Sequence, residues 1–439
     1  MPAKPLNDWL VLLEQRHPQD IDLGLERCGT VYRKLGSPRP ADKVFTVAGT
    51  NGKGSTVAYL AAMSAALGQR CGTYTSPHIH TFNERISVMG VAVSDELLVQ
   101  AFEQVEAARG PVSLTYFEFT TLAAFLILKQ AQLDVAVLEV GLGGRLDTVN
   151  LVDADCAVIT PIGLDHQDFL GPDIASIATE KAGIIRADTA VVCTETQPPG
   201  PVAEIAAGLA APIYRRGTEF NLLDEGGEQL KFSIAGKVFK FPRPPMGGKH
   251  QLDNLATALA AILLLNPVLV TDADGGSLSA LAELGMAIEN CKLPGRLQQL
   301  AASPDIFVDV GHNALAAEVI AAYFRGRPAT EVTCVLAMLA DKPAEAVALV
   351  LNDVVTHWLC ADSDGSRGQT GERLAQRLRV VLPAAKISHF SRPARAMDAA
   401  LSMAAGQDTI LAFGSFTTAS AVLEWQENSL GRDGHDAVH

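Results

Sequence analysis

A glycine-rich segment with a single lysine is the part of this sequence best suited to chemistry. It reads Gly49-Thr50-Asn51-Gly52-Lys53-Gly54-Ser55 and follows the apolar run 44–48. Glycines let backbone N–H groups converge on a phosphate, and the start of a helix adds partial positive charge there. Lys53 supplies a full, mobile charge. The order of strand, glycine loop, lysine and helix predicts a P-loop, with a tight turn and a solvated lysine as the alternative.

One position departs from the usual P-loop pattern. A Ser or Thr normally follows the lysine and binds Mg²⁺ through its hydroxyl, whereas Gly54 stands there in this chain. Metal ligands are therefore expected elsewhere, and Ser76, Glu139 and His166 each lie at or just beyond the end of a predicted strand. Open α/β sheets bind ligands at this edge. The alternatives are a Ser-Pro turn for Ser76, a salt bridge between Glu139 and Arg145, and a structural histidine.

Other polar segments have two interpretations each. Asp22-Leu23-Gly24-Leu25 could be a loop before a helix or a ligand contact, and Asn83-Glu84-Arg85 follows the Ser76 turn. Thr115-Tyr116-Phe117-Glu118 opens an apolar helix, where aromatic residues usually join the core but where Phe117 could also stack on a flat ring. Lys181 follows Glu180 and by itself suggests an ion pair at a helix end.

The glycine segment resembles the ATP loop of the Mur ligase superfamily, and within it the folylpolyglutamate and dihydrofolate synthases. The resemblance runs in order from Asp22 to Gly414-Ser415-Phe416. It implies a carbon–nitrogen ligase of folate biosynthesis and one-carbon metabolism, which would use ATP to add L-glutamate to dihydropteroate and to folyl(poly)glutamates. The acceptor carboxylate would be activated as an acyl phosphate. The expected cofactors are ATP, two Mg²⁺ ions and a monovalent cation.

The resemblance also implies roles for individual residues. Lys53, Lys181 and His166 would be catalytic, with Lys181 carrying a carbamate formed from CO₂; Ser76, Glu139 and His166 would bind metal. The remaining implied contacts are with ATP, at Thr50, Asn51, Gly52, Lys53, Gly54, Ser55, Asn254, Arg296 and Asp309, and with the pterin, at Asp22, Leu23, Gly24, Leu25, Thr115, Tyr116, Phe117, Glu118, Leu146, Asp147 and Thr148. Without the resemblance, Asn254 would be a helix-face amide, Arg296 a surface arginine and Asp309 part of a strand-end turn.

Two other functions remain open. A peptidoglycan Mur ligase would share the loop and the chemistry, but it usually carries a further domain before the ATP domain, and here the loop begins at Gly49. A non-catalytic P-loop nucleotide switch would hydrolyse ATP slowly and without glutamate. Phosphate release with and without glutamate separates these classes.

The predicted elements give an α/β fold with two domains. Residues 1–295 are expected to form the P-loop domain with a mainly parallel sheet, and residues 296–439 a smaller Rossmann-like α/β domain that would bind glutamate. The helix after the loop is predicted to open at Ser55-Thr56, and residues 189–245 to alternate short strands and turns with a hairpin at 230–241. Further strands are expected at 71–75, 134–140, 156–160, 306–310, 332–336, 358–361 and 409–413.

Composition limits the classes of partner. The chain has 439 residues, 48% of them hydrophobic, and a net charge of −14, which argues against a nucleic-acid or anionic membrane surface. Its seven cysteines form no C-x-x-C pair, which favours buried free thiols in a reducing cytoplasm. No secretory signal opens the chain, and no coiled-coil segment suggests an oligomer, so a cytoplasmic monomer is expected.

Overall fold

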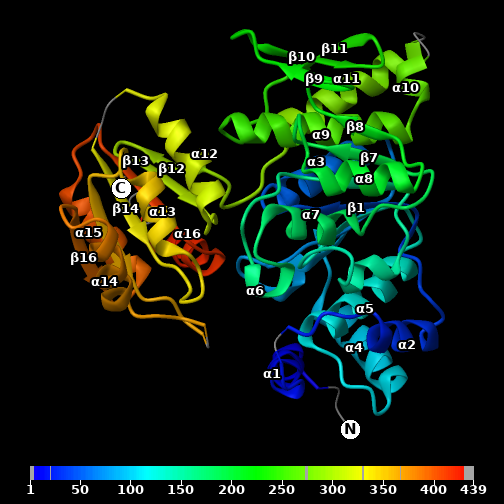
Figure 1. The fold of residues 1–439 in the computed structure, drawn as a ribbon, viewed down its shortest axis with the longest axis horizontal. Helices are drawn as coiled ribbons and strands as arrows, with labels where there is room; N and C mark the ends of the chain where they lie inside the picture. The colour runs from blue at the N-terminus through cyan, green and yellow to red at the C-terminus, as the bar shows by residue number, and fades with distance from the viewer. Residues whose placement is uncertain (1–3, 20, 272–274, 329–330, 366, 430–439) are drawn as a thin grey trace, which may run out of the picture. The chain divides into compact units, whose positions relative to one another are not determined.

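A computed structural model describes residues 4–19, 21–271, 275–328, 331–365 and 367–429. The chain divides into two compact units, one of residues 1–245 and 251–291 and the other of residues 246–250 and 292–439. The division after Cys291 comes shortly before the predicted boundary at Pro294-Gly295-Arg296. Figure 1 colours the chain by residue number from its N-terminus to its C-terminus, and the two units are described separately below.

The first unit is organised around an eight-stranded sheet with the order β4-β3-β2-β5-β1-β6-β7-β8. Its strands are β1 (Ala41–Ala48), β2 (Cys71–Tyr74), β3 (Ile86–Val88), β4 (Val91–Ala92), β5 (Leu133–Glu139), β6 (Cys156–Ile159), β7 (Ala190–Cys193) and β8 (Ile213–Arg215). Strand β3 pairs antiparallel with both β2 and β4, and the remaining neighbours pair parallel. The carboxyl ends of β1, β2, β5 and β6 therefore share one edge, where the candidate residues follow.

Helices cover both faces of this sheet. In Figure 1, α3 and α9 lie on one side of β1, and α4 and α5 lie on the other. The helices of this unit are α1 (Leu6–Arg16), α2 (Glu26–Lys34), α3 (Lys53–Ala66), α4 (Asp95–Arg109), α5 (Tyr116–Gln130), α6 (Gln167–Leu170), α7 (Ile174–Ala182), α8 (Gly200–Gly208), α9 (Lys249–Leu265), α10 (Val268–Thr271) and α11 (Gly275–Asn290). Two short 3-10 helices add to them, η1 (Phe82–Arg85) and η2 (Thr148–Leu151). Burial on both faces explains why β1 and β5 are continuous apolar runs.

The segment 189–245 differs in part from its prediction. Helix α8 occupies Gly200–Gly208, where only strands and turns were expected. The small residues and Pro199-Gly200-Pro201 hid this helix, although a proline at the first helical positions is compatible with helix initiation. The predicted hairpin is correct: β10 (Gln229–Ile234) pairs antiparallel with β11 (Lys237–Pro242), and β9 (Phe220–Leu223) completes the small sheet.

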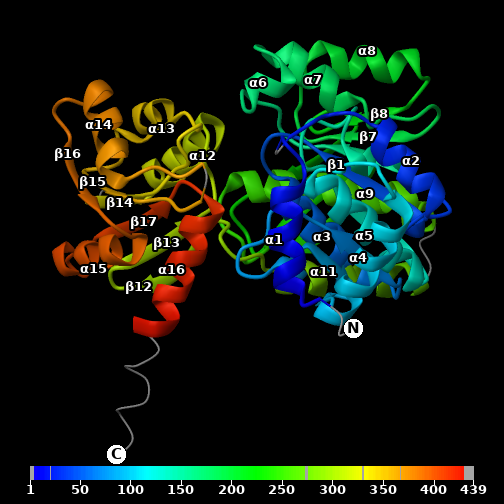
Figure 2. The ribbon, with the colours of Figure 1, turned by 90° about the horizontal axis from the view of Figure 1, so that it is seen from below.

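The second unit contains a six-stranded sheet with the order β12-β13-β17-β14-β15-β16. Its strands are β12 (Gln298–Ala302), β13 (Asp305–Asp309), β14 (Val332–Leu336), β15 (His357–Ala361), β16 (Lys386–Phe390) and β17 (Thr409–Phe413). Only β12 pairs antiparallel. Figure 2 shows α12 (Ala314–Arg325), α13 (Ala344–Leu351) and α14 (Gly371–Val381) on one face and α15 (Pro393–Met403) and α16 (Phe416–Ser429) on the other. The predicted α/β class is confirmed, while the edge strands β4, β12 and β16 and the neighbouring strand β3 were missed.

The burial of the cysteines agrees with their prediction. All seven are free and buried. Among the described residues, no helix combines the length and the apolar character needed to cross a membrane. The apolar helix α9 is instead almost wholly packed inside the first unit.

Candidate active site

The glycine loop joins β1 to α3 in a conformation that depends on glycine. Gly52 has a φ of 88° and stands immediately before α3, which begins at Lys53 and has no side-chain cap. The predicted start at Ser55-Thr56 was therefore late, because Lys53 and Gly54 already belong to the first turn. A Cβ atom at Gly49 would lie 1.8 Å from Oγ1 of Thr160, so only glycine fits there. An uncapped helix start beside a tight glycine turn suits an anion.

Neighbouring residues hold this loop from two sides. The backbone N–H of Thr50 donates to the Pro161 carbonyl at 2.8 Å, and the Gly163 N–H donates to Oγ1 of Thr50 at 3.0 Å. From α9, Nε2 of Gln251 donates to Oγ of Ser55 at 3.2 Å. A Cβ atom at Gly52 would lie 2.5 Å from Oδ1 of Asn254, which places Asn254 against the loop. The adenine contact predicted for Asn254 stays a prediction.

Two lysines converge on one carbonyl of the loop. Nζ of Lys53 donates to the Gly49 carbonyl at 3.0 Å and to the Thr50 carbonyl at 3.1 Å. Nζ of Lys181, from α7, donates to the same Gly49 carbonyl at 2.9 Å. The two nitrogens consequently lie within about 6 Å of one another. Like charges at this separation repel, so the pair favours a form in which one of them is not cationic.

Lys181 is a buried lysine with a strongly altered acidity. Its side chain is 4% exposed. Burial, and then the neighbouring charge of Lys53, lower its pKa to about 7, although Asp165 and Asp147 act in the opposite direction. A large share of the amine is therefore neutral and nucleophilic near neutral pH.

Both salt bridges offered as alternatives from the sequence are wrong. Nη2 of Arg145 donates to Oε1 of Glu180 at 2.7 Å, and Nε of Arg145 to the same oxygen at 3.1 Å. Arg145 is thus the ion-pair partner of Glu180, and not of Glu139. Lys181 projects away to Gly49, because neighbouring residues on a helix do not face each other. The sequence spacing could not reveal the Arg145–Glu180 pair, which joins residues 35 positions apart.

Two of the three predicted metal ligands are brought together. The backbone N–H of Ser76 donates to Oε2 of Glu139 at 3.3 Å, across the neighbouring ends of β2 and β5. Glu139 is 5% exposed and so is a buried carboxylate at the edge where the glycine loop begins. His166, with a left-handed φ of 52°, starts α6, and its Nε2 lies 3.8 Å from Oδ1 of Asp165. Its metal role stays a prediction.

Histidine, cysteine and carboxylate side chains of the described residues do not form a complete metal-binding site. Within the described ranges, no group of three or more of these side chains could bind a metal by itself. Ser76 and Glu139 supply oxygen donors, which are the donors that Mg²⁺ prefers. A site of few protein ligands suits Mg²⁺ that keeps waters and is shared with substrate phosphates, so these residues fit the ion.

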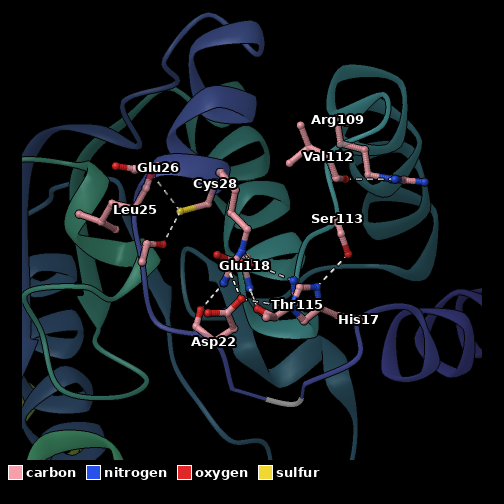
Figure 3. Close-up of polar contacts among 12 residues, drawn as sticks. His17, Asp22, Leu25, Glu26, Cys28, Arg109, Val112, Ser113, Thr115 and Glu118 are labelled. Atoms are coloured by element: carbon pink, nitrogen blue, oxygen red, sulfur yellow. Dashed lines mark hydrogen bonds and ion pairs between the residues drawn. The ribbon is translucent and has the colours of Figure 1, made fainter.

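The predicted pterin segments meet through a network of polar contacts, drawn in Figure 3. Arg27, from α2, donates to the side chain and backbone carbonyl of Asp22 and, through Nε, to Oε2 of Glu118 at 3.0 Å. The Thr115 N–H donates to the same Glu118 oxygen at 2.8 Å, which forms a capping box at the start of α5. The network therefore ties the segment 22–25 to the aromatic start of α5.

One atom of this network is unsatisfied. Glu118 is 4% exposed, and its Oε1 is buried without a hydrogen-bond partner among the residues that the structure describes. A buried carboxylate oxygen without a donor is costly, so such an atom marks a place where a bound ligand could supply one. Leu23 and Leu25 pack against the core, and the Gly24 carbonyl accepts from Sγ of Cys28 at 3.4 Å.

The aromatic start of α5 lies against the second glycine loop. A Cβ atom at Gly141 would lie 2.4 Å from Cζ of Phe117, so the ring packs directly on this backbone. Asp147 is buried in the same loop; its carboxylate accepts from the N–H groups of Leu142 and Val149, each at 2.9 Å. Burial raises its pKa to about 6, although these backbone bonds and Lys53 lower it. Leu146 is half-buried, and buried Thr148 begins η2.

Arg296 and Asp309 belong to the second unit. Asp309 accepts from the N–H of Leu297 at 2.7 Å and from the N–H of Gly311 at 2.7 Å. Burial raises its pKa, while these bonds and the charge of Arg296 lower it. The guanidinium of Arg296 lies 5.1 Å from the centre of the Phe416 ring. The carboxylate thus orders the strand-end turn, and the ATP contacts predicted for both residues stay predictions.

Comparison with known proteins gives a consistent result along the chain. The family model "Mur ligase middle domain" matches residues 47–262, and "Mur ligase, glutamate ligase domain" matches residues 295–416. The Escherichia coli K12 protein named dihydrofolate synthase/folylpolyglutamate synthase is 41% identical over 96% of this chain and 96% of its own length. The chain belongs to this family of Mur ligases. The expectation drawn from the glycine loop is thereby confirmed.

Solved structures of family members share the whole fold. An E. coli structure in complex with DHPP and ADP has a TM-score of 0.88 at 41% identity and covers 96% of this chain and 97% of its own. A bifunctional folylpolyglutamate synthase/dihydrofolate synthase with Mn, AMPPNP and L-glutamate bound has a TM-score of 0.85 at 38% identity, covering 96% and 98%. The first of these proteins therefore binds ADP and DHPP, and the second binds Mn, AMPPNP and L-glutamate.

Sequence reasoning missed several residues of the site. No role was predicted for Arg27 or for Gln251. The spacing of Thr115 and Glu118 is the sequence signal of a capping box and could have predicted the buried carboxylate. No local signal links Arg27 to Glu118, which are 91 positions apart.

Proposed function

We propose that this protein uses ATP to add L-glutamate to dihydropteroate and to folyl(poly)glutamates. The observation that supports this function best is the glycine loop, in which Lys53 and Lys181 both donate to the Gly49 carbonyl. The strand-end residues Ser76 and Glu139 are hydrogen-bonded to each other, and the chain belongs to this ligase family. A free carboxylate is a poor acceptor for an amine, so phosphorylation by ATP supplies the leaving group. The glutamate amine then displaces phosphate from the acyl phosphate and forms the amide.

The chain's own residues have distinct tasks in this proposal. The start of α3 and Lys53 bind the phosphates and offset their charge as it shifts towards the leaving group. Glu139, Ser76 and His166 hold Mg²⁺, which when bound withdraws negative charge from the phosphates. Two such ions and a monovalent cation are part of the proposal.

The pterin end of the acceptor is assigned to the network around Glu118. Phe117 offers a ring face to a flat heteroaromatic group, and the partnerless Oε1 of Glu118 would accept from one of its N–H groups. Asp22 and Thr115 belong to the same network (Figure 3), and the proposal also assigns pterin contacts to Leu146, Asp147 and Thr148 in the second glycine loop. These contacts rest on the positions of the side chains and on the family.

Lys181 is proposed to act as a carbamate. Its neutral amine can add to CO₂ and release one proton, so that the group beside Lys53 becomes an anion. The new group would attract Lys53 and could help to orient the metal ions. The protein is proposed to act as a cytoplasmic monomer without a nucleic-acid partner, in keeping with its net charge of −14.

Phosphate release from ATP tests the function. With dihydropteroate, release should depend on added glutamate and should match the glutamylated product mole for mole. A nucleotide switch would release phosphate without glutamate, and a ligase for another acceptor would show no additional phosphate release when dihydropteroate is added. Either result would overturn the proposal.

A further inference from the structure

Arg85 is a half-buried cation that the proposed chemistry does not yet use. It ends η1, in the connection between β2 and β3. Its guanidinium carbon lies 5.3 Å from the centre of the Phe82 ring and 5.5 Å from that of Tyr116. Its Nε donates to Nδ1 of His78 at 3.0 Å. Two rings and one imidazole thus hold the guanidinium in place.

No carboxylate of the described part of the chain forms an ion pair with Arg85. The adjacent acid, Glu84, accepts instead from the backbone N–H groups of Ile79, His80 and Thr81 at 2.7–2.8 Å. A half-buried guanidinium normally pairs with an anion, because its five N–H donors have a fixed geometry that matches a carboxylate. Among the residues that the structure describes, only Nε has a side-chain acceptor, so the terminal Nη groups retain donors for a ligand.

The position of Arg85 lies between the two ends of the proposed acceptor site. Its carbonyl accepts from the N–H of Thr75 at 2.8 Å, which places its backbone beside Ser76 and the metal-binding end. Its side chain lies over Tyr116, the neighbour of Phe117 at the pterin end. Because Nδ1 of His78 accepts from Arg85, a neutral His78 ring carries its proton on Nε2 and can also donate.

We propose that Arg85, assisted by His78, binds the non-reacting α-carboxylate of a glutamylated acceptor. This inference rests on the proposed function. Dihydropteroate carries a single carboxylate, the one that reacts, whereas a folyl glutamate brings a second carboxylate into the same site. A buried anion needs a compensating cation, and Arg85 provides one between Thr75 and the Tyr116 ring. Arg85 would then distinguish the two acceptors of a bifunctional enzyme.

The test compares the two acceptors in one variant. Arg85→Gln should raise the KM for tetrahydropteroyl-monoglutamate at least tenfold more than the KM for dihydropteroate, at saturating ATP and glutamate. Arg85→Lys should change the ratio of the two KM values less, since an ammonium keeps the positive charge but loses the paired N–H donors of the guanidinium. Arg33→Gln, an exposed arginine on α2, is the matched control and should leave the ratio unchanged. Equal losses with both acceptors, or no change in the ratio, would overturn the proposal.

A second measurement on the wild-type protein does not depend on the variant folding. Replacing the α-carboxylate of the monoglutamate acceptor by an α-carboxamide should weaken binding tenfold or more, measured by quenching of tryptophan fluorescence. In Arg85→Gln the same replacement should change binding less than twofold. Equal affinity of the wild type for the acid and the amide would overturn the carboxylate site. If the wild type glutamylated neither acceptor, the proposed function would fail, and this binding comparison would still decide the site.

Discussion

Replacing Lys181 by arginine tests the most unusual feature of the site. Lys181 and Lys53 share the Gly49 carbonyl, so their nitrogens lie within about 6 Å of one another. At an effective dielectric constant of about 20, two positive charges at that distance repel by about 3 kcal/mol. A carbamate at Lys181 reverses the sign of this interaction. A guanidinium cannot react with CO₂ in this way and stays cationic, so Lys181→Arg makes the repulsion permanent.

The acidity of Lys181 shows why the lysine can be modified. At pH 7, an amine with the ordinary pKa of 10.5 is neutral in roughly one molecule of three thousand, whereas a pKa of about 7 leaves about half of it neutral. Burial thus increases the reactive form by about a thousandfold. Since about 3 kcal/mol corresponds to roughly a hundredfold, Lys181→Arg should reduce glutamate-dependent phosphate release by about that factor or more.

The assay is initial-rate phosphate release with dihydropteroate and glutamate. Lys181→Ala should also lose activity, and a short carboxylic acid in the buffer should restore part of it. In the wild type, ¹³C-bicarbonate should give a carbamate resonance that Lys181→Arg lacks. A Lys181→Arg enzyme with normal activity and normal metal dependence would refute the carbamate. The Glu180 ion pair cannot then be the explanation, because Glu180 is paired with Arg145.

Stability provides a separate pH test of the unmodified lysine. The folded-state pKa of about 7 lies below the ordinary value of 10.5, so between these values the folded protein binds fewer protons than the unfolded chain. The free energy of unfolding should therefore rise as the pH increases from about 7 towards 10.5. Without CO₂, urea denaturation of the wild type should show this rise relative to Lys181→Met. A difference that does not vary with pH would contradict the altered acidity.

Four further substitutions test other parts of the site. Lys53→Ala should remove most ATP-dependent synthesis without unfolding the protein, since it deletes the lysine of the phosphate loop; turnover within about threefold of wild type would contradict the P-loop assignment. Glu139→Gln and His166→Ala should shift the Mg²⁺ concentration needed for half-maximal rate, and unchanged metal curves for both would argue against ligation. Glu118→Gln should cost about 1–3 kcal/mol in urea denaturation, because it weakens the bond from Arg27, and should raise the KM for dihydropteroate more than that for ATP. Equal changes in the two KM values would indicate a purely structural role.

Local patterns predicted the framework of the site well. The apolar run before Gly49 specifies a buried strand, and the glycines around Lys53 specify a phosphate-binding turn. The residues that determine the strand, the turn and the start of the helix all lie within about ten positions of the chain. The same reasoning placed Ser76 and Glu139 at neighbouring strand ends, where the structure joins them by a hydrogen bond. Strands β3, β4, β12 and β16, which lie at or next to the sheet edges, were not predicted. Each is either only two or three residues long or largely exposed, and so lacks a buried apolar run.

The contacts that give the site its chemistry connect distant parts of the chain. Lys181 and Gly49 are 132 positions apart, and nothing near Lys181 in the sequence indicates that its ammonium is buried beside another lysine. When only sequence neighbours are considered, Glu180 is the expected partner of Lys181, yet Arg145 pairs with that carboxylate from another loop. Because Arg145 pairs with Glu180, Lys181 faces the phosphate loop, where the charges of Asp165 and Asp147 only partly offset burial and the charge of Lys53. The altered acidity of Lys181 is therefore a property of the packing of α7 against the loop, and it arises only when the sheet has formed.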